Sequence, residues 1–263
     1  MWASLAVALL AAQAVSLPSP SGARSASVRS GSGSPAVVIT DHSGRVVATL
    51  QPRPAEGCSS VSGLEWAGED AVSVTCHINP SLNAFVEMEI ATGKVRRELL
   101  GYGFTRSPDG LRVAHVGWYP HFSPPFAKSN VLQLDSLVVY PLPAGGRPVV
   151  RNGMDPAPGA PTAKGGTWSG IHEFVPDFHW SSDSRRVAFI DCVYAWTVDA
   201  QDNSRGQEHG RRCSVAVVDL EGRATLSPLP ELKPAGLLQL KLAWNGPREL
   251  TVSGPASLTL RAR

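Results

Sequence analysis

The sequence predicts an all-β protein, and three observations predict it. From about Ala36 onward, short runs rich in Val, Leu, Phe and Trp alternate with turns rich in Gly, Asp, Ser and Pro, which is the pattern of short strands joined by tight turns. No segment keeps the apolar period of a helix. The third observation is an internal repeat of strand, polar turn and strand.

The composition allows a packed core and argues against nucleic acid as a partner. Of the 263 residues, 43% are hydrophobic and 17% are charged, which is the balance of a globular chain. The 24 Lys and Arg residues face 22 Asp and Glu residues, giving a net charge of +2. No basic field strong enough to hold a polyanion follows from that charge.

The first 35 residues differ from the rest. Residues 1–14 form a short apolar run that ends in Ala12-Gln13-Ala14 and predict a signal peptide, with a buried N-terminal helix as the alternative. We therefore expect an exported protein, periplasmic or extracellular. No later apolar run reaches the length of a membrane span. Residues 15–35, rich in Ser, Gly and Pro, predict a flexible linker, and residues 36–263 predict one β domain.

The repeat is anchored on an aromatic or Arg residue followed by a polar turn. The turn Ser-Pro-Asp-Gly of the second copy has the residues that close a tight hairpin. Four segments share the pattern: Leu64 to Val74, Phe104 to Ala114, Phe178 to Phe189, and Leu242 to Val252. A second hairpin follows each of the first three, so two hairpins make a four-stranded blade.

Phe104 to Ala114 and Phe178 to Phe189 resemble the repeats of TolB-like β-propellers, which are relatives of the Trp-Asp (WD) repeats. The resemblance implies a small β-propeller of about four four-stranded blades and carries no particular activity. The hairpin Val37 to Leu50 and the strands before Arg263 look like halves of one blade shared by the two ends. Such sharing would remove two exposed strand edges. The alternatives are a degenerate blade within 151–175, or an open arc completed by a partner.

The strand directions of such blades place the long connections 118–133, 151–175 and 193–212 on one face, opposite the short hairpin turns. Long loops on a rigid scaffold are where binding usually lies. These connections are rich in aromatic and His residues, whose stiff rings suit recognition. The candidate binding residues are Trp118, Tyr119, His121, Trp168, His172 and Trp196.

The leading hypothesis is a noncatalytic binding module that recognises a protein, peptide or glycan, with no cofactor. No hydrolase elbow, phosphate loop or dinucleotide fingerprint is present. The alternative is a hydrolase or lyase with a His and Asp site, with or without metal. Its candidates are His77, His172 and Asp191, although the sequence has none of the usual zinc spacings. His115 and His179 are interpreted as structural residues inside strands.

The four cysteines show no C-x-x-C spacing and, in an exported chain, predict two disulfides. Spacing alone leaves three pairings open. The blade assignment favours Cys58 with Cys76, because the loop that enters the first full blade and the end of its second strand lie on the same face. It also favours Cys192 with Cys213, which flank the connection 193–212.

Overall fold

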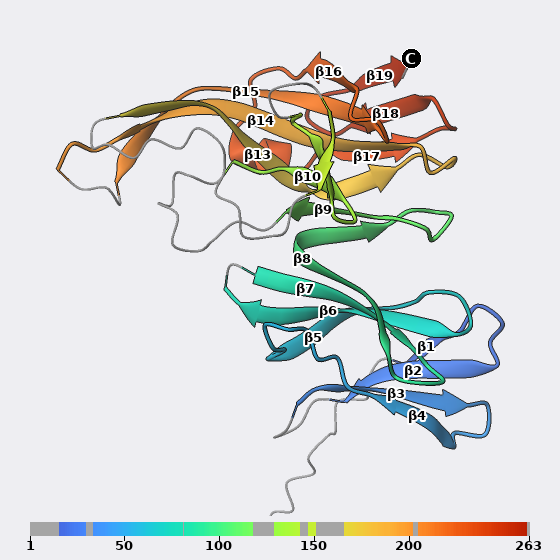
Figure 1. Ribbon diagram of the computed structural model, residues 1–263. Helices are drawn as coiled ribbons and strands as arrows, with labels where there is room; N and C mark the ends of the chain where they lie inside the picture. The colour runs from blue at the N-terminus through green and yellow to red at the C-terminus, as the bar shows by residue number, and fades with distance from the viewer. Residues whose placement is uncertain are drawn as a thin grey trace, which may run out of the picture. The chain divides into compact units, whose positions relative to one another are not determined.

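The computed structural model describes residues 16–29, 34–80, 82–117, 129–142, 147–150, 166–201 and 205–261, and these residues form an all-β protein (Figure 1). The single helix of this part, α1 (Pro234–Leu237), has four residues and a Pro in its first turn. No helix in the described ranges combines the length and the apolar character needed to cross a bilayer. The predicted signal peptide, residues 1–14, lies outside the described residues.

The chain divides into two compact units. The first unit contains a four-stranded sheet in the order β1-β2-β3-β4. It also contains β5, β6 up to Ile78, the second half of β7 and the start of β8, which are neighbours in one sheet, and β5 pairs antiparallel with β6. The bounds are β1 (Ser16–Pro18), β2 (Arg24–Arg29), β3 (Ala36–Asp41), β4 (Val46–Leu50), β5 (Ser60–Trp66), β6 (Ala71–Asn79), β7 (Leu82–Glu89) and β8 (Val95–Arg106).

The second unit begins its main run at Leu99, inside β8. Its strands pair in the orders β8-β9-β10-β11-β12, β13-β14-β15-β16 and β17-β18-β19. The bounds are β9 (Val113–Gly117), β10 (Leu132–Leu134), β11 (Leu137–Tyr140), β12 (Val149–Val150), β13 (Thr167–Trp180), β14 (Arg186–Val198), β15 (Gly206–Asp219), β16 (Ala224–Pro228), β17 (Lys241–Trp244), β18 (Glu249–Ser253) and β19 (Leu258–Arg261).

One turn geometry recurs in three hairpins, β1-β2, β8-β9 and β13-β14. In each case a Ser N–H donates to the carbonyl of an Arg five residues later, and the residue three after the Ser has a positive φ. The three turns are Ser19 to Arg24, Ser107 to Arg112 and Ser181 to Arg186, with Ser to Arg distances of 2.9 Å throughout. The shared geometry defines a repeat more clearly than the anchor residue does.

The prediction of a flexible linker over residues 15–35 is therefore wrong for its described part. Ser19-Pro20-Ser21-Gly22 is a copy of Ser107-Pro108-Asp109-Gly110, and it joins β1 to β2 as the later turn joins β8 to β9. The segment has few large apolar side chains, but β2 needs few, because it buries one face only through residues such as Ala26. Backbone pairing with β3 completes the strand.

A second repeated contact ties successive sheets together within each unit. The indole N–H of an anchor Trp donates to a carbonyl two residues before a turn serine. The pairs are Trp66 to Leu17 (3.0 Å), Trp180 to Thr105 (3.0 Å) and Trp244 to His179 (2.8 Å). The anchor Trp therefore satisfies its own polar group and an orphan carbonyl of its neighbour, as a buried indole requires.

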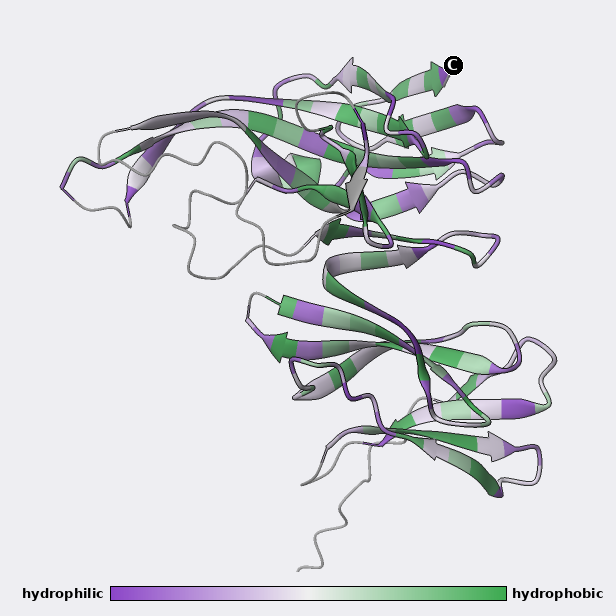
Figure 2. Cartoon of the chain, viewed as in Figure 1, coloured by the Kyte–Doolittle hydropathy of each residue, from purple (hydrophilic) through white to green (hydrophobic). Residues whose placement is uncertain are grey.

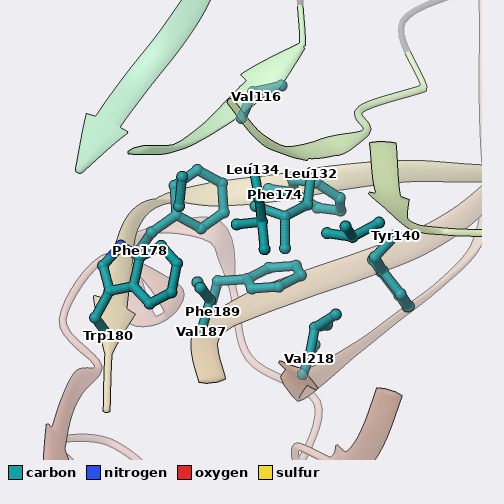
Figure 3. Close-up of a cluster of buried hydrophobic side chains, with 13 residues drawn as sticks. Val116, Leu132, Leu134, Tyr140, Phe174, Phe178, Trp180, Val187, Phe189 and Val218 are labelled. Carbon is teal, nitrogen blue, oxygen red and sulfur yellow. The ribbon is translucent and has the colours of Figure 1, made fainter. Parts of the chain in front are cut away.

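The largest core cluster of the second unit lies where β13 and β14 pack on β9, β10 and β11. Phe189 is fully buried, and its ring centroid lies 4.7 Å from that of Phe174 and 5.4 Å from that of Phe178 (Figure 3). Figure 2 shows hydrophobic residues along these strands and hydrophilic residues at the turns. This packing fixes β13 and β14, the strands that carry the candidate site.

The predicted sharing of one blade by the two chain ends is not found. The hairpin β3-β4 pairs with β2, while β17, β18 and β19 pair only with one another among the described strands. The sheets are thus not joined into a ring by strand pairing in this part of the chain. The physical reason is that β1 and β2, which were not foreseen, already complete a four-stranded sheet with the N-terminal hairpin.

Candidate functional site at the β-arm

Three neighbouring strands that lie wholly in the second unit are longer than the strands that follow them. β13, β14 and β15 have 14, 13 and 14 residues, whereas β16 has 5 and pairs only with Ser214 to Val218 of β15. Their outer halves project as a three-stranded arm (Figure 1). We call this part, Thr167–Phe174, Cys192–Val198 and Gly206–Cys213, the β-arm.

The β-arm corrects the prediction that 151–175 and 193–212 are loops. Residues 167–175, 193–198 and 206–212 are strand, and the rest of these two stretches lies outside the described residues apart from Gly166 and the turn residues 199–201 and 205. Alternation could have revealed the strand, because Cys192, Tyr194, Trp196 and Val198 recur at every second residue.

Both predicted disulfides are confirmed. Cys192 and Cys213 are opposite each other on β14 and β15 at the base of the β-arm, with their Cα atoms 4.0 Å apart. Cys58 and Cys76, in the first unit, have a Cα–Cα distance of 5.2 Å. The first of these bonds joins the two strands at the point where the β-arm leaves the sheet.

One face of the β-arm carries an aromatic cluster of Trp168, Ile171, Tyr194 and Trp196. Trp168 is only 5% exposed, so the expectation of an exposed loop Trp is wrong for it. Trp196 is half-buried and packs so closely on Gly206 that a Cβ at residue 206 would collide with its indole. The predicted binding residues Trp118, Tyr119 and His121 lie outside the described residues.

Arg211 links all three strands of the β-arm. Its guanidinium lies 2.6 Å from Glu173 of β13, 2.6 Å from Glu208 of β15, and 4.6 Å from the ring centroid of Tyr194 on β14. Hydrogen bonding to Arg211 lowers the pKa of Glu208, and the two carboxylates raise the pKa of Arg211. Charge pairs of this bidentate kind hold strand positions better than single contacts.

A buried polar cluster lies at the base of the β-arm on the opposite side of the sheet. Asp191, whose side chain is 1% exposed, accepts hydrogen bonds at Oδ2 from Tyr140 Oη at 2.7 Å and His172 Nδ1 at 2.8 Å. The sequence-predicted pair His172 and Asp191 thus meets, while Tyr140 was not foreseen. Burial, and then the charge of Asp191, raises the pKa of Tyr140 well above its usual range, so Tyr140 stays a donor.

The contact with Asp191 fixes the orientation of the His172 ring. Nδ1 faces Oδ2 of Asp191, and Nε2 has no hydrogen-bond partner among the described residues. In the neutral ring with Nδ1–H donating, Nε2 is the acceptor nitrogen. The backbone of His172 is fixed on both sides, because its N–H donates to Ser129 and its carbonyl accepts from Asn130. This arrangement suits a proton acceptor held in one orientation.

The metal candidates do not come together as a set of three. His77 lies on β6 in the first unit, whereas His172 and Asp191 lie in the second. Among the described residues, no three His, Cys, Asp or Glu side chains gather in a way that could hold a metal ion. His115, interpreted as structural, is buried on β9 with Nε2 2.8 Å from the carbonyl of Asp135, and burial lowers its pKa.

A free strand edge is the feature that sequence reasoning missed. β15 pairs with β14 on one side, but from Gly206 to Arg212 no described strand pairs with its other side. Most of these residues are exposed. An unpaired edge presents a row of backbone donors and acceptors to solvent.

No family model matches this chain, and no curated protein matches it. Solved structures with a similar arrangement include TolB from Acinetobacter baumannii (14% identity, 95% of this chain and 55% of that chain, TM-score 0.35). The β-propeller domain of the Trilobed protease from Pyrococcus furiosus gives 10% identity, 93% and 82% coverage, and a TM-score of 0.34. Acylaminoacyl peptidase from Pyrococcus horikoshii gives 8%, 93% and 44%, and 0.37.

The chain spans 55% of the length of that TolB and 44% of that peptidase. Identities and TM-scores this low carry no information on activity. The chemistry of the site has to come from this chain's own residues.

Proposed function

We propose that this chain is an exported, noncatalytic binding module of β-propeller type that recognises an extended protein or peptide segment. The observation that carries the proposal is the edge of β15 from Gly206 to Arg212 on the β-arm, with which no described strand pairs. An extended segment adds to such an edge as a further strand, and main-chain hydrogen bonds supply the affinity. Two disulfides and the apolar residues 1–14 support export.

The ladder defines which amides of the edge are available. Asp199 N–H donates to the carbonyl of Arg205, so residues 199 and 205 form a hydrogen-bonded pair. Hydrogen-bonded and non-hydrogen-bonded pairs alternate along an antiparallel ladder. Gln207 is therefore bonded to Thr197, while the amides of Gly206 and Glu208 point away from β14, toward an incoming strand.

The side chains favour a peptide over a glycan as the ligand. A glycan needs exposed ring faces, but Trp168 is buried and the ring of Tyr194 is covered by Arg211. The charges of Glu208, Arg211 and Arg212 are of the kind that keeps a free edge from pairing with other copies of itself. Specificity would then come from side chains of the bound segment next to these charges.

The proposal is tested with a peptide selected from a random library displayed on phage against the whole chain. In Glu208→Pro the outward amide is removed while the ladder to β14 is left intact, since Pro is tolerated where the N–H of an edge strand faces solvent. Glu208→Ala is the matched control, because it also removes the carboxylate but keeps the amide. We expect the Pro variant to weaken peptide binding about tenfold more than the Ala variant.

Equal affinities of the two variants for the peptide, measured by calorimetry, would contradict binding of the peptide at the β15 edge. Circular dichroism of both variants shows that neither has unfolded.

The second candidate function is a hydrolase or lyase, favoured by the unpartnered Nε2 of His172 beside Asp191. In this hypothesis His172 accepts a proton at Nε2 and Asp191 stabilises the imidazolium. A panel of chromogenic esters, peptides and glycosides tests it. Turnover that disappears in His172→Gln supports the enzyme, and turnover that persists in that variant rejects this site. Elemental analysis of the purified protein tests the metal form of the same hypothesis.

A further inference from the structure

A small pocket of about 70 Å³ lies between β13, β14 and the segment from α1 to β17. At about 10–15 Å³ for each water-sized sphere, this volume has room for roughly five non-hydrogen atoms. Its wall is formed mainly by aliphatic side chains of β13, β14 and the segment from α1 to β17, including Val175, Ile190, Leu237 and Leu242. Two polar residues complete it, Asp177 and His179. The pocket therefore combines aliphatic side chains with polar groups, and Asp177 is the one carboxylate residue among those that line it.

Asp177 occupies a position where two other copies of the repeat have glycine. Counting three residues back from the anchors Trp66, Arg106 and Trp180 gives Gly63, Gly103 and Asp177, and the fourth anchor, Trp244, gives Lys241. The two glycines have φ of 59° and 67°, and Asp177 has φ of 134°. Each lies in a bulge where the first strand shifts register against the second.

A positive φ brings steric strain to a residue with a Cβ, whereas glycine adopts it without this strain. Strained backbone of this sort is retained where the side chain has a use. Asp177 and His179, at this bulge, line the pocket. In the copies that have glycine, the equivalent residue has no side chain that could do so. The departure from glycine thus coincides with the pocket.

The carboxylate of Asp177 is exposed and has no hydrogen-bond or ion-pair partner among the described residues. The nearby His179 does not supply a full positive charge at neutral pH, because burial lowers its pKa even though the charge of Asp177 opposes the effect. An unpaired anion beside an apolar pocket is complementary to a cation with an apolar body.

The rim and walls of the pocket also fit a ligand. Leu238, at the rim, is 72% exposed, the highest value among the large exposed hydrophobic side chains described. The two walls are tied together by the hydrogen bond from Trp244 to the carbonyl of His179. Gly254 lets β18 approach the backbone of Gln239 and Leu240 behind α1, where a Cβ would lie 2.6 Å from the Gln239 carbonyl. The pocket is therefore preformed.

We propose that this pocket binds a short branched aliphatic group carrying a primary ammonium, with the aliphatic part among Val175, Ile190, Leu237 and Leu242 and the ammonium at Asp177. A free aliphatic amine and the N-terminal residue of a peptide both have this chemistry. The site is separate from the edge of β15 and does not depend on it.

Binding to the full chain is measured by NMR titration with three probes. Leucinamide carries the ammonium and the branched chain, N-acetyl-leucinamide lacks the positive charge, and Leu-Gly-Gly-amide places the same group at a peptide N-terminus. We expect leucinamide to bind about tenfold more tightly than its acetylated form, since a charge-assisted hydrogen bond is lost. Tighter binding of the tripeptide identifies a peptide N-terminus as the source, and tighter binding of leucinamide identifies a small amine.

The variants separate a ligand role from a structural one. Asp177→Asn and Asp177→Gly should each weaken leucinamide binding about tenfold, and Asp177→Gly should also raise Tm by relieving the strained φ. Glu231→Gln, an exposed carboxylate next to the same segment but outside the pocket, is the matched control and should change nothing. Absence of binding by all probes, or binding that Asp177→Asn leaves unchanged, overturns the proposal.

Discussion

The hairpins β5-β6 and β13-β14 are two copies of one repeat, and they differ in what has been added. Both begin with a bulged strand, reach an anchor Trp and carry a cysteine of a disulfide on the second strand. In the first copy the strands have 7 and 9 residues and the bulge contains Gly63. In the second they have 14 and 13 residues, and Asp177 replaces the glycine.

The difference shows which parts of the repeat are structural. The indole hydrogen bond and the bulge occur in both copies, so they serve the fold. Of these two hairpins, only β13-β14 has the extended strands and Asp177. The extension is accompanied by an edge of β15 with which no described strand pairs, and Asp177 lines a pocket, while the bulge and the indole hydrogen bond are kept. The proposed functions of this chain therefore concentrate in one sheet.

Core truncation should have the largest effect and should differ between the copies. Phe189 and Val74 are equivalent and fully buried. Phe189→Ala should cost about 3–5 kcal/mol of unfolding free energy, because four rings pack there. Val74→Ala removes two methylene equivalents, about 2 kcal/mol. Urea unfolding measures both, and equal losses would show that the aromatic core adds nothing special to the second copy.

The two disulfides should stabilise by similar amounts. Their sequence separations are 18 and 21, so chain entropy gives about 3 kcal/mol for each. Replacing Cys192 and Cys213 with Ala should also speed amide exchange in Gly206–Arg212, because the β-arm loses the bond at its base. Replacing Cys58 and Cys76 should leave exchange in the β-arm unaltered. Mass-spectrometric exchange on the two double variants distinguishes these results.

Exchanging the bulge residues should shift stability in opposite directions. Asp177→Gly should stabilise the second unit by about 1 kcal/mol. Relief of the strained φ gains on the order of 1–3 kcal/mol, and the larger conformational entropy that glycine loses on folding reduces this gain. Gly63→Asp should destabilise the first unit, where a Cβ would also lie 3.1 Å from Thr75 Oγ1. Thermal unfolding of the two variants checks the signs. A destabilising Asp177→Gly would contradict the strain argument.

A smaller effect of pH should come from the turn carboxylates. The Ser107 hydroxyl, with the N–H of Leu111, holds the pKa of Asp109 below its ordinary value of 3.8. A carboxyl whose pKa is lower in the folded state than in the unfolded state contributes stability that is fully present above its unfolded pKa. This contribution is lost as the pH falls through the folded pKa. Asp109→Asn should therefore lose less stability than the wild type between pH 5 and pH 3, as measured by urea midpoints.

Much of the fold was predictable because strand alternation and turn residues are local. The all-β class, the hairpin at Ser107 and both disulfides follow from such patterns. The turn at Ser19 was missed because its flanking strands contain only two large apolar residues, Leu17 and Val28, whereas strands elsewhere in the chain have several. Comparison of Ser19-Pro20-Ser21-Gly22 with the later turns would have found it.

The site was less predictable because it depends on pairing partners. Alternation in 192–198 indicates a strand, but the hydrophilic run from Gly206 to Arg212 does not. Only pairing with β14 makes it a strand, and only the short β16 leaves its edge free. The meeting of His172 with Asp191 was within reach, whereas Tyr140 comes from β11, whose position along the core no local pattern specifies.

Residue-resolved amide exchange with the selected peptide bound is the most direct test of recognition at the β15 edge. Exchange should slow at Gly206 and Glu208, whose amides point outward, and stay unchanged at Gln207, which is already bonded to β14. Protection that ignores this alternation, or that appears in β5 and β6 instead, would contradict the assignment of binding to the β-arm.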